Sequence, residues 1–151
     1  MNSENTAARV IVGVDGSDFS STTLEMAGRM APAFGVPIEV ITCVGMSDYY
    51  LSSRLEHELT RFTSELEDTA RRLVDESLMR AFGDSPPAGL KVTVKFGEPA
   101  KVLVEESRHA RLLVVGRHGA GGFLGQAIGS VSRACAAHAH CPVLLVAADD
   151  E

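Results

Sequence analysis

The chain has 151 residues, with 14 Lys or Arg against 20 Asp or Glu, which gives a formal net charge of −6. This length corresponds to one ordinary domain, and 45% hydrophobic with 23% charged residues is typical of a globular protein. The acidic balance argues against broad binding to nucleic acid, which requires a basic face, but it leaves room for a small anionic ligand at a local site.

Targeting and membrane signals are missing from the sequence. No stretch approaches the ~18 consecutive apolar residues of a membrane helix, and residues 1–9 lack the apolar core of a secretory signal. The three cysteines, Cys43, Cys135 and Cys141, form no C-x-x-C pair, which indicates reduced intracellular thiols. We therefore expect a cytoplasmic protein with no membrane partner. A redox role for Cys135 or Cys141 would need an exposed thiol of lowered pKa, which the sequence does not reveal.

The first half of the chain predicts two strands, each followed by a helix. Residues 9–14 form a β-branched run that ends in Asp15-Gly16-Ser17, so we predict a buried strand and then a turn. Ser17 or Asp18 is expected to cap the next helix, and Gly35 to end it with a positive φ. The second strand is predicted over 38–44, a loop over 45–52, and a long helix over about 53–82. The apolar stripe of that helix is predicted from Leu55, Leu59, Phe62, Leu66 and Leu73.

The second half predicts three more strands and two more helices. Residues 90–96 alternate between apolar and polar, which indicates a strand with one wetter face. Gly97-Glu98-Pro99 opens a helix with proline near its first position, and Leu103, Val104 and Ala110 are expected on its buried side. A fully apolar strand follows over 112–115. A glycine-rich loop over 117–128, a helix spaced by Val131, Ala134 and His138, and a strand over 142–147 complete the pattern.

Five strands alternating with four helices predict an α/β fold. Strands that are apolar on both faces and are joined by helices indicate an open parallel sheet with helices on both faces, and right-handed crossovers make it doubly wound. No internal repeat, linker or low-complexity region interrupts the pattern. We therefore predict a single domain over 1–151, with its ordered core at about residues 9–147.

Two turns at the carboxyl ends of predicted strands form the candidate ligand site. The first is Gly13-Val14-Asp15-Gly16-Ser17, and the second is Gly116-Arg117-His118-Gly119, followed nine residues later by Gly129-Ser130. Glycines let backbone N–H groups approach an anion, and Ser130 opens a helix whose N-terminus favours phosphate. The P-loop pattern is absent and the dinucleotide pattern that begins at Gly119 is incomplete. The residues alone therefore predict a glycine-rich anion loop, with a plain surface loop as the alternative.

The spacing Gly116-x-x-Gly119, nine residues, Gly129-Ser130 resembles the G-2x-G-9x-G-[S/T] pattern of the universal stress protein family. Three further blocks are similar to that family and stand in its order, so that the resemblance spans 9–147. They are Val12 to Ser17, Gly97-Glu98-Pro99-Ala100, and Cys141 to Val146. The resemblance implies a Rossmann-like sheet of the adenine nucleotide alpha hydrolase type, with strand order 3-2-1-4-5. Its switch point would lie between the first and fourth strands.

The resemblance also implies a ligand, because family members with the complete glycine pattern are the ATP-binding kind. Carried over residue by residue, the glycines and the start of the last helix would hold the ribose and the phosphates. Asp15 would face the ribose or the adenine, Val14 would wall the base pocket, and Val44 would offer backbone groups to the base. The implied ATP-binding residues are Val14, Asp15, Val44, Gly116, Arg117, His118, Gly119, Gly129, Ser130, Val131 and Ser132.

The expected function is that of an ATP-binding stress-response regulator, with or without magnesium. No general base paired with a water site is evident, so at most slow ATP hydrolysis is expected and no catalytic residue is assigned. Residues 120–128 contain no Lys or Arg, and Arg117 and His118 are the nearby candidates for charge. The resemblance implies cyclic AMP in the same pocket as the first alternative, because some family members prefer it, and the lack of Lys and Arg in the loop favours a ligand with fewer charges. A protein-interaction module that binds no nucleotide is the second.

The sequence predicts no metal site and implies one partner, a second copy of the chain. His138 and His140 stand two apart on a predicted helix and so point to different faces; no metal site is predicted. The resemblance implies a homodimer formed through the last strand, Val143–Val146, whose apolar edge would pair with its twin. No nucleic-acid partner is expected, and the sequence does not identify a protein partner.

Overall fold

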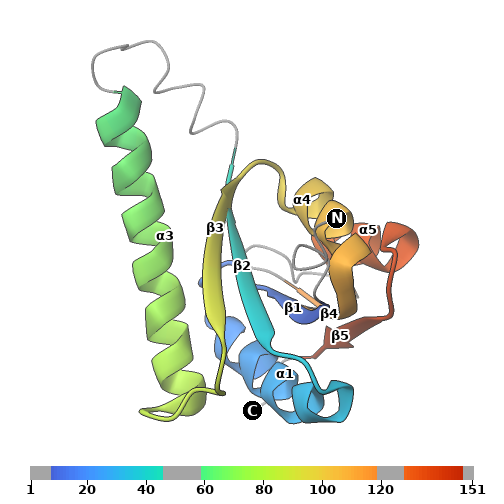
Figure 1. Ribbon diagram of the computed structural model, residues 1–151. Helices are drawn as coiled ribbons and strands as arrows, with labels where there is room; N and C mark the ends of the chain where they lie inside the picture. The colour runs from blue at the N-terminus through green and yellow to red at the C-terminus, as the bar shows by residue number, and fades with distance from the viewer. Residues whose placement is uncertain (1–7, 46–58, 119–127, 148–151) are drawn as a thin grey trace, which may run out of the picture.

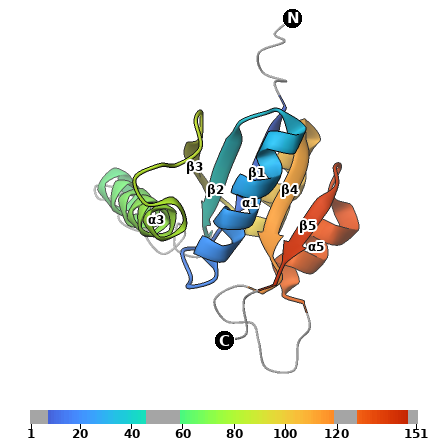
Figure 2. The same cartoon turned by 90° about the horizontal axis from the view of Figure 1, so that it is seen from below.

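The computed structural model describes residues 8–45, 59–118 and 128–147, with the side chains of the long helix described from Thr63 onward. These residues form one five-stranded parallel sheet in the order β3-β2-β1-β4-β5, with helices on both faces, which confirms the predicted fold (Figure 2). The strands are β1 (Arg9–Gly13), β2 (Ile38–Val44), β3 (Lys91–Phe96), β4 (Ala110–Gly116) and β5 (Val143–Val146). The helices are α1 (Ser20–Phe34), α3 (Leu59–Phe82), α4 (Pro99–Glu106) and α5 (Ser130–His138), with a short 3-10 turn at Ser107–His109.

Two apolar layers flank the sheet, because alternate residues of each buried strand point to opposite faces. Val10 and Val12 of β1 pack with α1 and α3 on one face, and Ile11 packs with α4 and α5 on the other. Figure 1 shows α3 standing beside β3, with α4 and α5 on the opposite side of the sheet. A strand buried on both faces needs the continuous β-branched run that the sequence of β1 provides.

The crossing point of the chain lies beside β1, which pairs in parallel with both β2 and β4. The chain leaves β1 toward β2 and β3, then returns past it to β4, so the connections after β1 and β4 diverge at the carboxyl ends of these strands. An open parallel sheet leaves a crevice at such a point. Gly13 pairs with Val115 at this end, which places both predicted turns side by side.

The cap of α1 differs from the prediction. The helix begins at Ser20, its N-cap residue is Phe19, and no side chain caps it. The prediction that Ser17 or Asp18 caps the helix is therefore wrong, because these residues belong to a separate turn that precedes it. At the other end the prediction is confirmed, since Gly35 has φ 68° and its N–H donates to the Ala31 carbonyl at 3.0 Å.

The helix after β3 is also shorter than predicted. Pro99 occupies its first turn and Leu103 is buried, as expected. Ala110, however, starts β4 instead of lying on the helix, so its placement on the helix face was wrong. The buried Ser107 hydroxyl explains this end: it donates to the Val104 carbonyl at 2.6 Å and accepts the His140 N–H at 2.8 Å. The α4–β4 corner is thus tied to the α5–β5 corner.

Of the stripe predicted for the long helix α3, Leu66 is half-buried and Leu73 departs from the prediction. Val74 and Ser77 are buried, whereas Leu73 is 40% exposed. The predicted stripe positions Leu55, Leu59 and Phe62 have no side chain within the described part of the chain.

The membrane prediction concerns helix length and apolar character. Among the described residues, no helix combines the length and the apolar character that crossing a bilayer requires.

We predict that Ser107→Ala lowers the free energy of unfolding by about 1–2 kcal/mol, because it removes a buried hydroxyl that joins two corners. Urea denaturation monitored by circular dichroism measures this as a lower midpoint with an unchanged m value. The exposed Ser64→Ala on α3 is the control and should stay within about 0.5 kcal/mol of wild type. Equal midpoints for wild type and Ser107→Ala would contradict the proposed role of the Ser107 hydroxyl.

Candidate functional site

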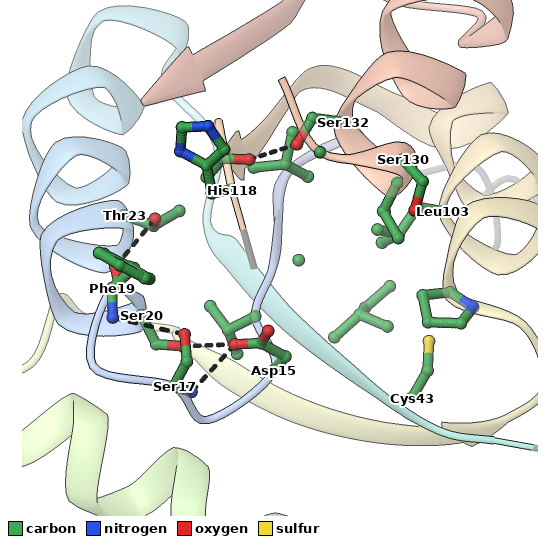
Figure 3. A pocket seen from close by; sticks show the side chains of 18 residues that line it. Asp15, Ser17, Phe19, Ser20, Thr23, Cys43, Leu103, His118, Ser130 and Ser132 are labelled. Carbon is green, nitrogen blue, oxygen red and sulfur yellow. Dashed lines mark hydrogen bonds between the residues drawn. The ribbon is translucent and has the colours of Figure 1, made fainter. Parts of the chain in front are cut away.

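A cavity of about 490 Å³ opens at the carboxyl end of the sheet, at the crossing point beside β1 (Figure 3). Its wall is formed by the ends of β1, β2 and β4 and by the first turns of α1, α4 and α5. This volume lies within the range of about 300–1,000 Å³ that is usual for small-molecule sites. The position is the one that the sequence predicted from its two turns.

The turn after β1 is braced by its own hydrogen bonds. The Ser17 N–H donates to Asp15 Oδ1 at 2.9 Å, and the Ser20 hydroxyl donates to the same oxygen at 3.4 Å. The Gly16 N–H donates to Ser20 Oγ at 3.1 Å, and Gly16 has a φ of 79°, which glycine adopts without strain. Asp15 thus stabilises its own turn as an acidic turn residue does, while Asp15, Ser17 and Ser20 also line the cavity (Figure 3).

The start of α5 forms the opposite wall. Gly129 is the N-cap residue, and its N–H donates to the Arg117 carbonyl at 2.7 Å. The buried Ser132 hydroxyl donates to the Gly116 carbonyl. These two bonds fasten the first turn of α5 to the end of β4. Because the first N–H groups of a helix have no acceptor within the helix, this end is suited to hold an anion.

The structure brings together most of the predicted site residues. Val14, Asp15, Gly116, His118, Gly129, Ser130, Val131 and Ser132 line the cavity. Val44 and Arg117 do not line it. The Val44 carbonyl accepts the Gly97 N–H at 2.9 Å, and Arg117 is exposed while its N–H donates to the Val146 carbonyl at 2.8 Å. Gly119 lies outside the described residues.

Sequence reasoning missed one wall of the cavity. Ile41 and Cys43 of β2 line it together with Pro99 and Leu103 of α4. The alternation of β2 carried a usable signal, because Cys43 shares its face with Ile41, whereas Val44 points to the other face. The sequence of α4 contained no such signal, since the approach of this helix to the cavity depends on how it packs over β1 and β2.

The charge of the described lining is low. Asp15 is its carboxylate and His118 its imidazole, and no Lys or Arg is among the described lining residues. Burial raises the pKa of the Cys43 thiol to about 11, partly offset by the positive charge of Lys95. A thiol of this pKa is neutral at physiological pH, so Cys43 presents a weakly polar surface to the cavity. Within the described ranges, no group of three or more His, Cys, Asp or Glu residues is placed to hold a metal ion.

Comparison with known proteins identifies the family. Residues 7–147 match the sequence profile of the Universal stress protein family. The chain belongs to the universal stress protein family. A universal stress protein of Mycobacterium tuberculosis is 31% identical over 99% of this chain and 51% of its own length. One of Mycolicibacterium smegmatis is 33% identical over 91% of this chain and 45% of its own length. The chain therefore spans about half the length of these curated relatives.

Solved structures share the fold of this universal stress protein. One from Lactobacillus plantarum has a TM-score of 0.66 at 20% identity, covering 93% of this chain and 98% of its own. A universal stress protein in complex with cAMP has a TM-score of 0.58 at 23% identity, covering 95% and 99%. One from Archaeoglobus fulgidus in complex with dAMP has a TM-score of 0.52 at 21% identity, covering 93% and 98%.

We predict that alkylation of Cys43 by iodoacetamide accelerates about tenfold per pH unit between pH 8 and pH 10, since the thiolate is the reactive form. The raised pKa means that the thiolate fraction is still rising over this whole range. Timed alkylation followed by mass spectrometry of the peptide measures the rate. An unfolded sample supplies the control, because its Cys43 should level off near the ordinary thiol pKa of about 8.5. A plateau near pH 9 in the folded protein would contradict the buried, neutral thiol.

Proposed function

We propose that the cavity binds an adenine nucleotide, with ATP as the leading ligand, and that the protein acts as a nucleotide-dependent stress-response regulator. The observation that carries this proposal is the convergence of the β1 turn, the end of β4 and the N-terminus of α5 on one cavity. The adenine nucleotides in the two similar structures described above support the choice of base.

The phosphate end of the ligand is proposed to lie at the start of α5. Gly129 and Ser130 line the cavity there, and the backbone N–H groups of the first turn, the Ser130 hydroxyl and the helix dipole all favour negative charge. The Ser132 hydroxyl already donates its proton to Gly116, so its contribution to a phosphate would come from its backbone N–H. This end of the cavity offers hydrogen-bond donors to an anion, whereas the Asp15 carboxylate is itself an anionic acceptor.

The base and the ribose are proposed to occupy the rest of the cavity. Ile41, Cys43 and Leu103 form an apolar wall suited to the faces of a purine ring. The Asp15 carboxylate is an acceptor for the ribose hydroxyls, and it would repel phosphate. Val44 pairs with Phe96 of β3 and its carbonyl accepts the Gly97 N–H, so both of its backbone groups face β3. We therefore do not propose the backbone contact to the base that the resemblance implied for Val44.

Cyclic AMP is the second candidate, and the low positive charge of the cavity favours it. The described lining contains no Lys or Arg, and the intervening sequence 119–127 contains none either. A triphosphate would then rely on backbone donors, His118 and a bound magnesium ion, whereas a cyclic monophosphate carries a single negative charge. We expect binding to act by shifting the populations of conformations that a protein partner distinguishes, with ATP hydrolysis slow at most.

We predict that calorimetric titration detects binding of ATP or cyclic AMP to the wild-type protein. Gly129→Val should weaken that binding at least about tenfold, because a side chain at the N-cap obstructs the approach of phosphate to the helix N–H groups. Titrations with and without magnesium separate a triphosphate ligand from a cyclic one.

The exposed Ala136→Val on the same helix is the matched control and should bind like wild type. Absence of heat with either nucleotide would reject the proposed function and favour an interaction module. Unchanged affinity in Gly129→Val would reject the proposed phosphate position.

We also propose a homodimer formed through β5. The strand lies at one edge of the sheet, with β4 on its inner side. The Pro142 and Val146 carbonyls bond to β4, so by alternation the backbone groups of Val143 and Leu145 face the outer edge. An apolar strand with outward N–H and C=O groups is a template for pairing.

Val143→Pro should convert a dimer to a monomer, because it removes an outward N–H while leaving the bonds to β4 in place. Size-exclusion chromatography with light scattering at micromolar concentration measures the mass. Val143→Ala loses a similar side chain but keeps the N–H, so it should remain dimeric. A monomeric wild-type protein would contradict the proposed dimer.

A further inference from the structure

The long helix α3 contacts the back of the turn whose front lines the cavity. Gly16 lies directly against Leu73: a Cβ built at Gly16 would stand 2.9 Å from Leu73 Cβ and 3.3 Å from its Cδ1. Leu73 is not among the described residues that line the cavity. The backbone of Gly16 is thus packed between a side chain of α3 and the hydrogen bonds of the Asp15 turn.

The turn transmits this contact to the cavity because it is internally braced. Gly16 donates its N–H to Ser20, and Ser20 and Ser17 both donate to Asp15 Oδ1. A shift of Gly16 away from Leu73 would therefore move the acceptor oxygen that organises the turn. The same turn contributes Asp15, Ser17 and Phe19 to the wall of the cavity (Figure 3).

The part of α3 that carries Leu73 is held in place by buried neighbours. Val74 and Ser77, next to Leu73 along the helix, are fully buried, and Val74 belongs to the core shared with α1 and the sheet. One turn further on, Arg80 approaches Asp18 of the same loop at 3.8 Å, although both side chains are exposed and the pair is worth little. The apolar contact at Leu73 is the stronger of the two links.

We propose that Leu73 is a positioning residue for the nucleotide cavity: it holds the Asp15–Phe19 turn, through Gly16, in the geometry that receives the ligand. This inference rests on the proposed nucleotide binding. Leu73 would thus influence the affinity of the site for its ligand although it does not line the cavity. Linkage then requires the reverse effect, so a bound nucleotide tightens the contact between the turn and α3.

The partial exposure of Leu73 makes the proposal testable, because truncating it leaves no large buried cavity. Leu73→Ala is expected to weaken binding of ATP and of cyclic AMP by about threefold to thirtyfold, the range typical of substitutions that act through a coupled element. The volume-conserving Leu73→Met should restore affinity to within about twofold of wild type. Met79→Ala, an exposed truncation on the same helix, is the control and should leave affinity unchanged.

A double-mutant cycle tests whether Leu73 acts through the turn. Asp15→Ala removes the acceptor that braces the turn, so adding Leu73→Ala to it should cost much less affinity than Leu73→Ala costs alone. Additive losses would show that Leu73 acts by another route and would overturn the proposal. Unchanged affinity in Leu73→Ala, with wild type binding, would do the same.

Hydrogen exchange separates this inference from the proposed function. In the ligand-free protein, the Ser17 N–H bonded to Asp15 should exchange faster in Leu73→Ala than in wild type or Met79→Ala. If wild type binds neither nucleotide, the proposed function fails, and the exchange rate alone decides whether Leu73 holds the turn. Equal Ser17 exchange in wild type and Leu73→Ala would overturn the positioning role.

Discussion

The site depends on the fastening of α5 to the end of β4. The Ser132 hydroxyl bonds the Gly116 carbonyl and the Gly129 N–H bonds the Arg117 carbonyl, so the first turn of α5 is aimed at the cavity. Gly116 lies in a tightly packed place, since a Cβ there would lie 3.1 Å from the His118 carbonyl oxygen and 3.2 Å from Thr23 Oγ1. The small size of Gly116 therefore has a structural reason that holds without any ligand, whereas the bond from the Gly129 N–H requires only a residue other than proline. The motif that indicates phosphate binding also builds the wall that would perform it.

The two edge strands of the sheet, β3 and β5, differ in the side chains that surround them. At β3, the Arg71 guanidinium donates to the outward Val92 carbonyl at 3.4 Å. Lys91 and Thr93 also gather around the buried Glu39 carboxylate of β2, at 3.9 Å and 2.7 Å. Separating a buried carboxylate from its partners is costly, so these contacts stabilise the register between β2 and β3. The apolar β5 edge carries no charged residue. The β5 strand thus lacks the charged side chains that β3 carries at the other edge of the sheet.

Local patterns predicted the parts of the molecule that local forces decide. The apolar runs of β1 and β4, the positive φ of Gly35 and the proline at the start of α4 follow from side-chain branching and backbone sterics. The errors arose where distant contacts decide. Ser107 ends α4 through a bond to His140, 33 residues away, and Leu73 faces a turn instead of the core. Cys43 lines the cavity together with Pro99 and Leu103 of α4, a helix more than 50 residues further along the chain.

The distribution of charge in the cavity implies an orientation for the proposed ligand. The helix N-terminus attracts anions through backbone N–H groups, which carry fixed partial charges and do not titrate. Asp15, on the opposite wall, repels them and accepts hydrogen bonds from hydroxyls. A nucleotide placed with its phosphate at Asp15 would lose both interactions, so the two walls together select one direction. Because the apolar wall of Ile41, Cys43 and Leu103 is neutral, it adds contact with the base without opposing that choice.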